Sequence, residues 1–253
     1  MNSSRTAQKH SLQHDGMYYL DFFSLLNETH KPNSYFEIGT STGDSLQRFD
    51  CDAACVDPNF QIASHVWRRR QRTLLFQMTS DEFFAKETLR NYFPKGPDLC
   101  FLDGMHLFEN ILRDFINTEK ASHPGTMVLI HDALPVNLRM AERVPRQGSA
   151  DEGLYHNAWT GDVWRVIVAL NKYRPDLRIR LLNTPPTGLV AITSLDHKSR
   201  VLSDKYDQII ADSMKTNLNM ELLERVWDLY PMIDTANYSN SPDKLVAELF
   251  ARG

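Results

Sequence analysis

The stretch Tyr35–Gly43, with the sequence YFEIGTSTG, decides the fold of this 253-residue chain. An apolar strand runs into the acidic residue Glu37 and then into a G-x-x-x-G turn between Gly39 and Gly43. Asp57 lies fourteen residues beyond Gly43 and closes a second apolar run, AACVD. A glycine turn lets a ligand approach the backbone, and an acid at the end of the next strand can bind the two ribose hydroxyls. The pattern therefore indicates a nucleoside-containing cofactor.

The residues between the glycines indicate which cofactor. In the dinucleotide fingerprint G-x-G-x-x-G, the second glycine lets the backbone approach the pyrophosphate and the third lets the helix pack on the strand. Ser41 and Asp44 stand at those positions, and an acid at a helix N-terminus repels phosphate. S-adenosylmethionine has no phosphate and carries a sulfonium and an ammonium group, so an acidic loop with Glu37 and Asp44 suits it. The alternative is a tight turn without a ligand, because short glycine patterns recur by chance.

The composition predicts one large cytoplasmic domain. The chain is 42% hydrophobic and 24% charged, which is sufficient for a substantial core. Its formal net charge of -4 and the lack of a long basic run argue against a protein that mainly binds nucleic acid. No window approaches the roughly 20 apolar residues of a membrane span, and the first sixteen residues lack the apolar core of a signal peptide. Three cysteines without a C-x-x-C pattern predict neither a disulfide framework nor a zinc site.

Short apolar runs alternate with amphipathic stretches from about residue 34 onward, which predicts an α/β fold: a mostly parallel sheet with helices on both faces. Seven strands are expected, at 34–39, 53–57, 72–78, 98–103, 126–131, 177–183 and 188–193. Helices are expected at 16–26, 43–49, 60–71, 80–93, 107–121 and 161–173. The connection Thr184–Gly188 is too short for a crossover helix, so the last two strands should form a terminal antiparallel hairpin.

The chain is expected to have three segments. Residues 1–33 form an N-terminal tail and helix, residues 34–195 form the cofactor-binding domain, and residues 196–253 form a helical extension packed on that domain. The extension either caps the fold or contacts a second subunit through its apolar set, Leu222, Leu223, Val226, Leu229 and Tyr230.

A second group of candidate residues follows two later strands. The fourth strand ends in LDGMH, with Asp103 and His106, and the fifth ends in IHDA, with His131 and Asp132. Ligands of open parallel sheets gather at the carboxyl ends of the strands, so these side chains should share one edge. Two carboxylates and two imidazoles are the composition of a divalent-metal site or of an acid–base pair. Each aspartate could instead cap a turn, and strand alternation should point His131 away from Asp132.

The connection Leu134–Trp159 is longer than most and carries Arg139, Arg143 and Arg146. Long loops in compact domains are usually lids, binding loops or disordered segments. We expect either a lid that recognises an anionic or glycosylated acceptor, or a solvated loop whose arginines contact nothing.

The segment WTGDVW that follows this loop has two interpretations. Its tryptophans and acid could face substrate, or Thr160 or Asp162 could cap a helix while the tryptophans pack in the core.

Over residues 34–195 the sequence resembles the class I S-adenosylmethionine-dependent methyltransferases. EIGTSTG matches their glycine-rich first motif, VDP their ribose-binding acid, and FLDGMH and VLIHD their fourth and fifth strand ends. The resemblance implies a Rossmann-like fold and an S-adenosyl-L-methionine-binding enzyme. The implied cofactor-binding residues are Glu37, Gly39, Thr40, Gly43, Asp57, Ser80 and Asp103.

The D-G-x-H and H-D pair is similar to metal-assisted O-methyltransferases of small molecules and sugars. It implies Asp103, Asp132 and His131 as ligands of a divalent metal, Mg or Mn, and His106 as the catalytic base in place of the lysine of the catechol branch. Ala133 stands where that branch has a third ligand, an asparagine, so His131, His106 or water would have to replace it.

The implied acceptor is a small hydroxylated metabolite or a sugar, and the C-terminal helices could join two copies of the chain. Two other functions stay open. One is a metal-dependent oxygenase or hydrolase on the same scaffold, and the other is a non-catalytic protein that binds the cofactor.

Overall fold

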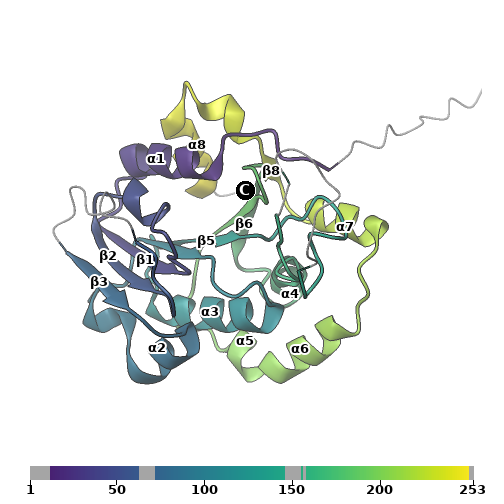
Figure 1. The fold of residues 1–253 in the computed structure, drawn as a ribbon, viewed down its shortest axis with the longest axis horizontal. Coiled ribbons are helices and arrows are strands. Elements are labelled where there is room, and N and C mark those ends of the chain that lie inside the picture. The colour runs from purple at the N-terminus through teal and green to yellow at the C-terminus, as the bar shows by residue number, and fades with distance from the viewer. Residues whose placement is uncertain (1–11, 63–71, 146–154, 156–157, 251–253) are drawn as a thin grey trace, which may run out of the picture.

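The structure, a computed structural model, describes residues 12–62, 72–145, 155 and 158–250. Its centre is an eight-stranded sheet of order β3-β2-β1-β4-β5-β7-β6-β8 (Figure 1). Within this sheet β7 runs antiparallel to β5 and β6, and the other pairings are parallel. The strands are β1 Ser34–Ile38, β2 Asp52–Val56, β3 Thr73–Phe76, β4 Leu99–Leu102, β5 Met127–His131, β6 Arg178–Leu182, β7 Leu189–Thr193 and β8 Met232–Ile233.

The seven predicted strands and the antiparallel hairpin are confirmed as β1 to β7. β1, β5 and β7 are buried along their whole length, and strands buried on both faces read as continuous apolar runs. The predicted strand count was wrong by one, because β8 adds to the edge beside β6. β8 has two residues and is too short to produce a periodic pattern.

Eight α-helices are found in the described residues, together with short 3-10 turns. The predicted helix 107–121 is confirmed as α3, and 161–173 contains α4 after an initial turn. The α-helices are α1 Tyr19–His30, α2 Ser80–Lys86, α3 Phe108–Ala121, α4 Arg165–Tyr173, α5 Val201–Asp204, α6 Tyr206–Met214, α7 Met220–Trp227 and α8 Pro242–Phe250; the 3-10 turns are Leu46–Arg48, Leu89–Asn91 and Thr235–Tyr238.

Two helix predictions differ from the structure. The predicted helix 43–49 is reduced to the turn Leu46–Arg48, because Gly43 has a left-handed φ of 82° and the backbone is extended again at Phe49. The predicted helix 80–93 ends at Lys86, where the C-cap residue Glu87 is extended. Most of the predicted helix 60–71 lies outside the described residues.

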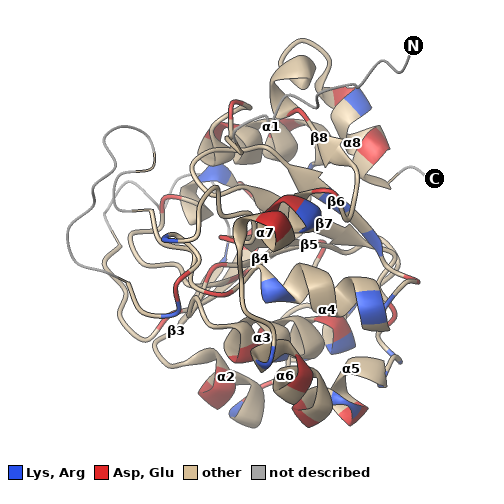
Figure 2. Cartoon of the chain, turned by 90° about the vertical axis from the view of Figure 1, so that its right-hand side faces the viewer, with Lys and Arg blue, Asp and Glu red and all other residues tan. Residues whose placement is uncertain are grey.

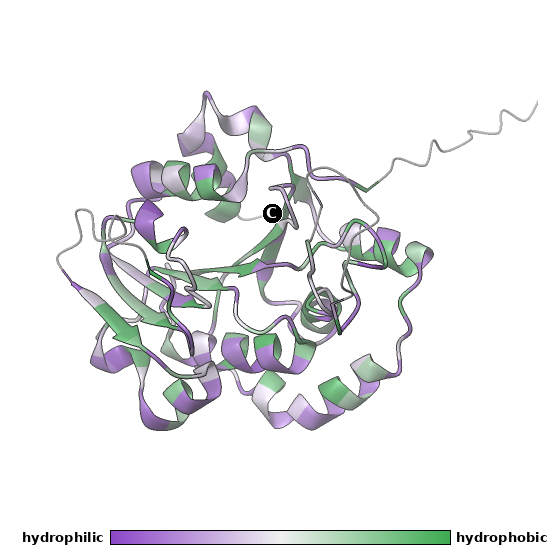
Figure 3. Cartoon of the chain, viewed as in Figure 1, coloured by the Kyte–Doolittle hydropathy of each residue, from purple (hydrophilic) through white to green (hydrophobic). Residues whose placement is uncertain are grey.

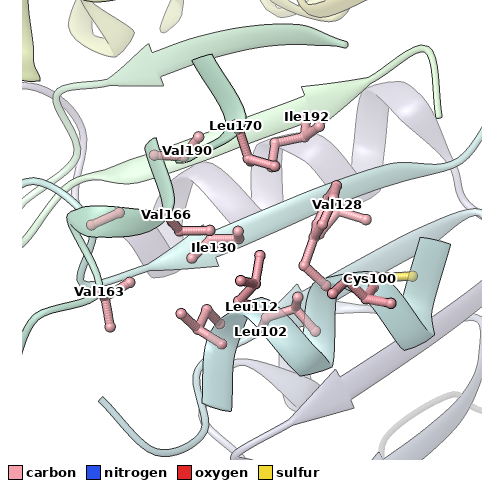
Figure 4. Close-up of a cluster of buried hydrophobic side chains, with 14 of the residues drawn as sticks. Cys100, Leu102, Leu112, Val128, Ile130, Val163, Val166, Leu170, Val190 and Ile192 are labelled. Carbon is pink, nitrogen blue, oxygen red and sulfur yellow. The ribbon is translucent and has the colours of Figure 1, made fainter. Parts of the chain in front are cut away.

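Different helices cover the two faces of the sheet, so the fold has three layers (Figure 1). α1 and α8 cover one face, and α3 and α4 cover the other. Hydrophobic residues gather on the strands and on the helix sides that face them (Figure 3). Figure 4 shows part of the core between the sheet and the helices α3 and α4, in which Leu112 of α3 and Leu170 of α4 lie with Val128 and Ile130 of β5. Helices therefore cover both faces of the sheet, and ligands can bind only at the edge where the strands end.

The C-terminal residues 196–250 pack on the same two cores. Val226 of α7 joins the core under α3 and α4, with Leu222, Leu229 and Tyr230 packed against it, and Leu249 of α8 joins the core under α1. Acidic residues lie on α5 and α6 (Figure 2), and the basic residues Lys205 and Lys215 lie just outside these two helices. This packing favours the cap interpretation of the extension. The division into three segments and the contact with a second subunit stay predictions.

Candidate functional site

The glycine turn lies at the end of β1 in direct contact with the end of β4. Gly39 has φ 89°, and a Cβ at this position would lie 1.8 Å from the carbonyl oxygen of Asp103. The Gly39 N–H donates to Val56 O at 2.9 Å and the Asp103 N–H donates to Ile38 O at 2.9 Å. Because only glycine fits this close approach without strain, the turn and the end of β4 form one surface.

A cavity of about 480 Å³ opens at this surface. β1 and β4 are neighbours at the point where the strand order reverses, which is where ligands bind in such sheets. The structure brings four predicted cofactor residues into its lining, whereas Glu37, Thr40 and Gly43 are not part of the lining that the described residues form. The lining comprises Ile38, Gly39, Ser41, Val56, Asp57, Pro58, Thr79, Ser80, Asp81, Asp103, Gly104, Met105 and Asn110.

Asp57 is the acid expected to bind ribose, and backbone groups fix its carboxylate. Oδ2 accepts a hydrogen bond from the Ser41 N–H at 2.8 Å, and Oδ1 accepts one from the Asn59 N–H at 2.7 Å. A carboxylate has about four acceptor sites, so Asp57 can hold its loop and still accept hydrogen bonds from two hydroxyl groups.

Glu37 lies beneath the glycine turn. Its side chain is fully buried and accepts a hydrogen bond from the Ser45 hydroxyl. Burial raises the pKa of Glu37 from 4.5 to about 7, although the bond from Ser45 acts in the opposite direction. The structure therefore places Glu37 as a support of the turn, and its predicted contact with the cofactor stays a prediction.

The four candidate residues that follow β4 and β5 form one cluster. His106 Nε2 lies 3.0 Å from Asp132 Oδ2 and 3.6 Å from Asp103 Oδ1. His131 Nδ1 lies 3.1 Å from Asp132 Oδ2 and 3.3 Å from Asp103 Oδ1. The prediction that these four residues lie together at one edge of the sheet is confirmed.

The expectation that His131 points away from Asp132 was wrong. Asp132 has φ 57°, in the left-handed region, so the regular alternation of side chains ends at His131 and the Asp132 carboxylate turns back to the imidazole. Aspartate enters this region more easily than most residues. The turn makes both residues available to one ligand.

Charges within the cluster change its pKa values strongly. Burial alone would lower the pKa of His106, but Asp132 and Asp103 outweigh it and raise the pKa to about 11. The pKa of His131 is raised to about 10, again by the two carboxylates against burial. Burial raises the pKa of Asp132, yet His131 and His106 outweigh it and hold that pKa well below its usual range.

Three of these residues could hold a metal ion. Asp103, His131 and Asp132 each offer one ligand atom, and these atoms lie within 4.8 Å of one another. Asp103 Oδ1 is buried and has no hydrogen-bond partner among the described residues, although His131 Nδ1 is close to it. A buried carboxylate oxygen without a hydrogen bond is costly, and a cation would satisfy it. The donor set therefore fits a divalent metal.

Sequence reasoning missed Tyr19 and Thr187 beside the cluster, and it named Trp159 only as one of two tryptophans that could face substrate. The ring of Tyr19 lies 4.7 Å from that of His131, and the ring of Trp159 stacks on His106 at 5.0 Å. The Trp159 carbonyl is 2.8 Å from His106 Nδ1, and Thr187 Oγ1 is 3.3 Å from His131 Nε2. These contacts join distant parts of the chain, and a local pattern carries no signal for them.

Of the arginines in the lid hypothesis, Arg143 has contacts that argue against a role in acceptor binding, whereas for Arg139 the hypothesis stays a prediction. Arg143 Nη1 lies 2.5 Å from Asp162 Oδ2, and Arg143 Nη2 lies 2.7 Å from Glu109 Oε1. Arg143 is therefore committed to ion pairs within the chain, and a role in acceptor binding is not supported. Arg146 lies outside the described residues. Asp162 Oδ1 also accepts a hydrogen bond from the Phe108 N–H at 2.8 Å and so caps α3. The capping interpretation was wrong for the helix that follows, because α4 has no side-chain cap hydrogen bond.

Comparison with known proteins indicates the class of protein to which this site belongs. Residues 36–133 match a family model described as a methyltransferase domain. This segment is therefore a methyltransferase domain. The matched segment contains the glycine turn and Asp57, Asp103 and Asp132. This match confirms the prediction of a methyltransferase.

Solved structures agree with this methyltransferase fold. One is the O-methyltransferase TomG from Streptomyces achromogenes, involved in tomaymycin synthesis, in complex with SAM. It matches with a TM-score of 0.52 and 16% identity, and the match covers 70% of this chain and 80% of that chain. Another is cofactor-bound Rv0187 from MTB, with a TM-score of 0.51, 12% identity, and coverage of 69% and 78%. No curated protein matches the sequence. Among the described residues, none of the helices has the length and apolar character required to cross a membrane.

Proposed function

We propose that the chain transfers a methyl group from S-adenosylmethionine to a hydroxyl of a small metabolite or sugar. The observation that carries the proposal is the double position of Asp103. Asp103 lines the cavity beside Gly39 and Asp57, and its carboxylate also belongs to the cluster with His106, His131 and Asp132. A donor in the cavity would therefore lie next to groups that can prepare an acceptor.

The cavity suits the proposed donor. Asp57 has acceptor capacity left for the ribose hydroxyls, and Asp81 and Asp103 add carboxylates to the lining. These acids favour a cationic ligand without phosphates. The two similar structures support a donor of this kind, since TomG is in complex with SAM and Rv0187 is cofactor-bound.

The chain's own residues would bind the donor, align it with the acceptor and exclude water. S-adenosylmethionine, when bound, supplies the methyl group in an in-line displacement, for which alignment of the reacting atoms can provide effective molarities of about 10⁵ M or more. Gly39 and Asp57 would fix the donor, while Tyr19 and Trp159 flank the two histidines and exclude water from them.

A metal-assisted reaction is the form of the proposal that the cluster supports. Asp103, His131 and Asp132 would hold a divalent cation, which, when bound, lowers the pKa of a coordinated hydroxyl. The bound cation would offset the carboxylate charge that raises the pKa of His106. His106, once neutral, would take up the released proton at Nε2, while the Trp159 carbonyl at Nδ1 keeps the ring in place. Cytoplasmic location stays a prediction.

Calorimetric titration with S-adenosylmethionine and its demethylated product tests the donor. We expect the wild type to bind both, and Asp57→Ala to bind them about tenfold to a hundredfold more weakly, since a hydrogen bond to a charged group contributes about 1.5–3 kcal/mol. Asp52→Ala is the matched control. Asp52 opens the same strand at its far end and pairs with the exposed Arg72.

Two results would count against the donor proposal. One is the lack of binding of either compound to the wild type, and the other is an Asp57→Ala variant that binds as tightly as Asp52→Ala. Turnover of hydroxylated acceptors that needs Asp103 but not the donor would favour the hydrolase or oxygenase alternative.

A further inference from the structure

We infer that His131 is a nitrogen ligand of the proposed metal and that the site therefore prefers Mn²⁺ and Co²⁺ to Mg²⁺. The inference rests on the proposed function, because it concerns the cation of that same site. Its basis is the position of His131, which adds a nitrogen to the two carboxylates, whereas Mg²⁺ prefers ligands that are all oxygen.

The ligand atoms already have a suitable spacing. His131 Nδ1 is 3.1 Å from Asp132 Oδ2 and 3.3 Å from Asp103 Oδ1. Neighbouring ligands of an octahedral ion with bonds of about 2.0–2.2 Å are separated by about 3 Å. The imidazole nitrogen therefore lies where a third ligand would lie, and no movement of β5 is needed to bring it there.

The second nitrogen of His131 fixes the form of the ring. Nε2 lies 3.3 Å from the hydroxyl of Thr187, a buried residue in the connection before β7. A cation between Asp103 and Asp132 would displace the proton that Nδ1 otherwise shares with these carboxylates, since a ligating nitrogen must be deprotonated. The proton on Nε2 can be donated to Thr187 Oγ1, which leaves the lone pair of Nδ1 for the cation. Ligating histidines commonly use their other nitrogen in this way, and loss of such a partner costs about 10-fold to 100-fold in metal affinity.

Packing holds the imidazole in that orientation. Its ring centroid lies 4.7 Å from that of Tyr19 and 5.8 Å from that of Phe101, and the side chain is only 9% exposed. A rigid, nearly buried imidazole cannot easily give way to the water ligands that Mg²⁺ retains. Two carboxylates with one imidazole suit ions that accept both oxygen and nitrogen, and affinity then rises from Mn²⁺ to Co²⁺.

The test is calorimetric titration of the full chain with CoCl₂, MnCl₂ and MgCl₂, with the absorption spectrum of bound Co²⁺ as a second readout. We expect Co²⁺ and Mn²⁺ to bind at least about tenfold more tightly than Mg²⁺. His131→Asp, which makes the ligand set all oxygen, should remove most of this preference and change the Co²⁺ spectrum. His123→Asn is the matched control, because His123 pairs with Asp98 elsewhere in the chain.

Thr187→Val provides a second variant that leaves the ligands intact, and it should weaken Co²⁺ binding by about tenfold or more. Equal affinity for Co²⁺ and Mg²⁺, an unchanged preference in His131→Asp, an unchanged Co²⁺ affinity in Thr187→Val, or lack of any metal binding would each overturn the inference. Parallel titration with S-adenosylmethionine separates the two proposals: a protein that binds the donor but shows no metal preference refutes only the inference, whereas one that does not bind the donor refutes the proposed function.

Discussion

The buried Glu37 should make the stability of this methyltransferase fall as the pH rises. Its pKa is raised from 4.5 to about 7 by burial, so between these values the native state holds a proton that the unfolded chain has lost. The free energy of unfolding then decreases with pH. The contribution of protonated Glu37 to the free energy of unfolding is fully present below about pH 4.5 and is lost above about pH 7. Each pKa unit corresponds to about 1.4 kcal/mol, so the total is about 3 kcal/mol.

Glu37→Gln removes the titrating group and keeps a side-chain oxygen for the Ser45 hydroxyl. Urea denaturation of wild type and variant between about pH 5 and about pH 8 should show the variant gaining about 2–3 kcal/mol relative to wild type as the pH rises. Glu28→Gln is the control, because Glu28 is an exposed carboxylate on α1. A constant difference between Glu37→Gln and wild type across this range would refute the reasoning, as would an equal change in the control.

Two further substitutions test the construction of the site. Gly39→Ala should destabilise the chain by more than about 2 kcal/mol, because a left-handed φ costs about 1–2 kcal/mol and the new Cβ would also meet the carbonyl oxygen of Asp103. Urea denaturation against Gly125→Ala, where a Cβ would meet only a histidine side chain, checks this. Asp162→Ala should cost about 3 kcal/mol, since it breaks a buried ion pair and the cap of α3. Thermal unfolding beside the exposed Asp228→Ala checks it, and equal stability of the two would contradict the assigned role.

The sheet could be predicted from the sequence because its strands are buried on both faces. Residues such as Met127–His131 form continuous apolar runs, and the short connection Thr184–Gly188 required a hairpin. The helix expected at 43–49 failed because helical periodicity says nothing about the φ of Gly43. β8 was invisible because two residues form no pattern, and their pairing with β6 depends on contacts across about fifty residues of chain.

The positions of site residues could be predicted where a general rule on strand ends applies. They could not be predicted where they depend on contacts between distant parts of the chain. The carboxyl-edge rule placed Asp103 and Asp132 together. The direction of Asp132 depends on a left-handed backbone at that residue, which the alternation rule does not include, so the rule gave the wrong orientation. Arg143 looked available in the sequence, yet Asp162 and Glu109, which bind it, lie 19 and 34 residues away.

The parts of the site divide between the matched domain and the rest of the chain. The glycine turn, Asp57 and the metal-type cluster lie within residues 36–133, the segment that matches the family model. The rings beside the two histidines come from outside it: Tyr19 begins α1, and Trp159 follows the long loop. Thr187 belongs to the hairpin connection. Under the proposed function, the donor side and the acceptor side are therefore built from separate parts of the sequence, so the acceptor could change while the donor chemistry is retained.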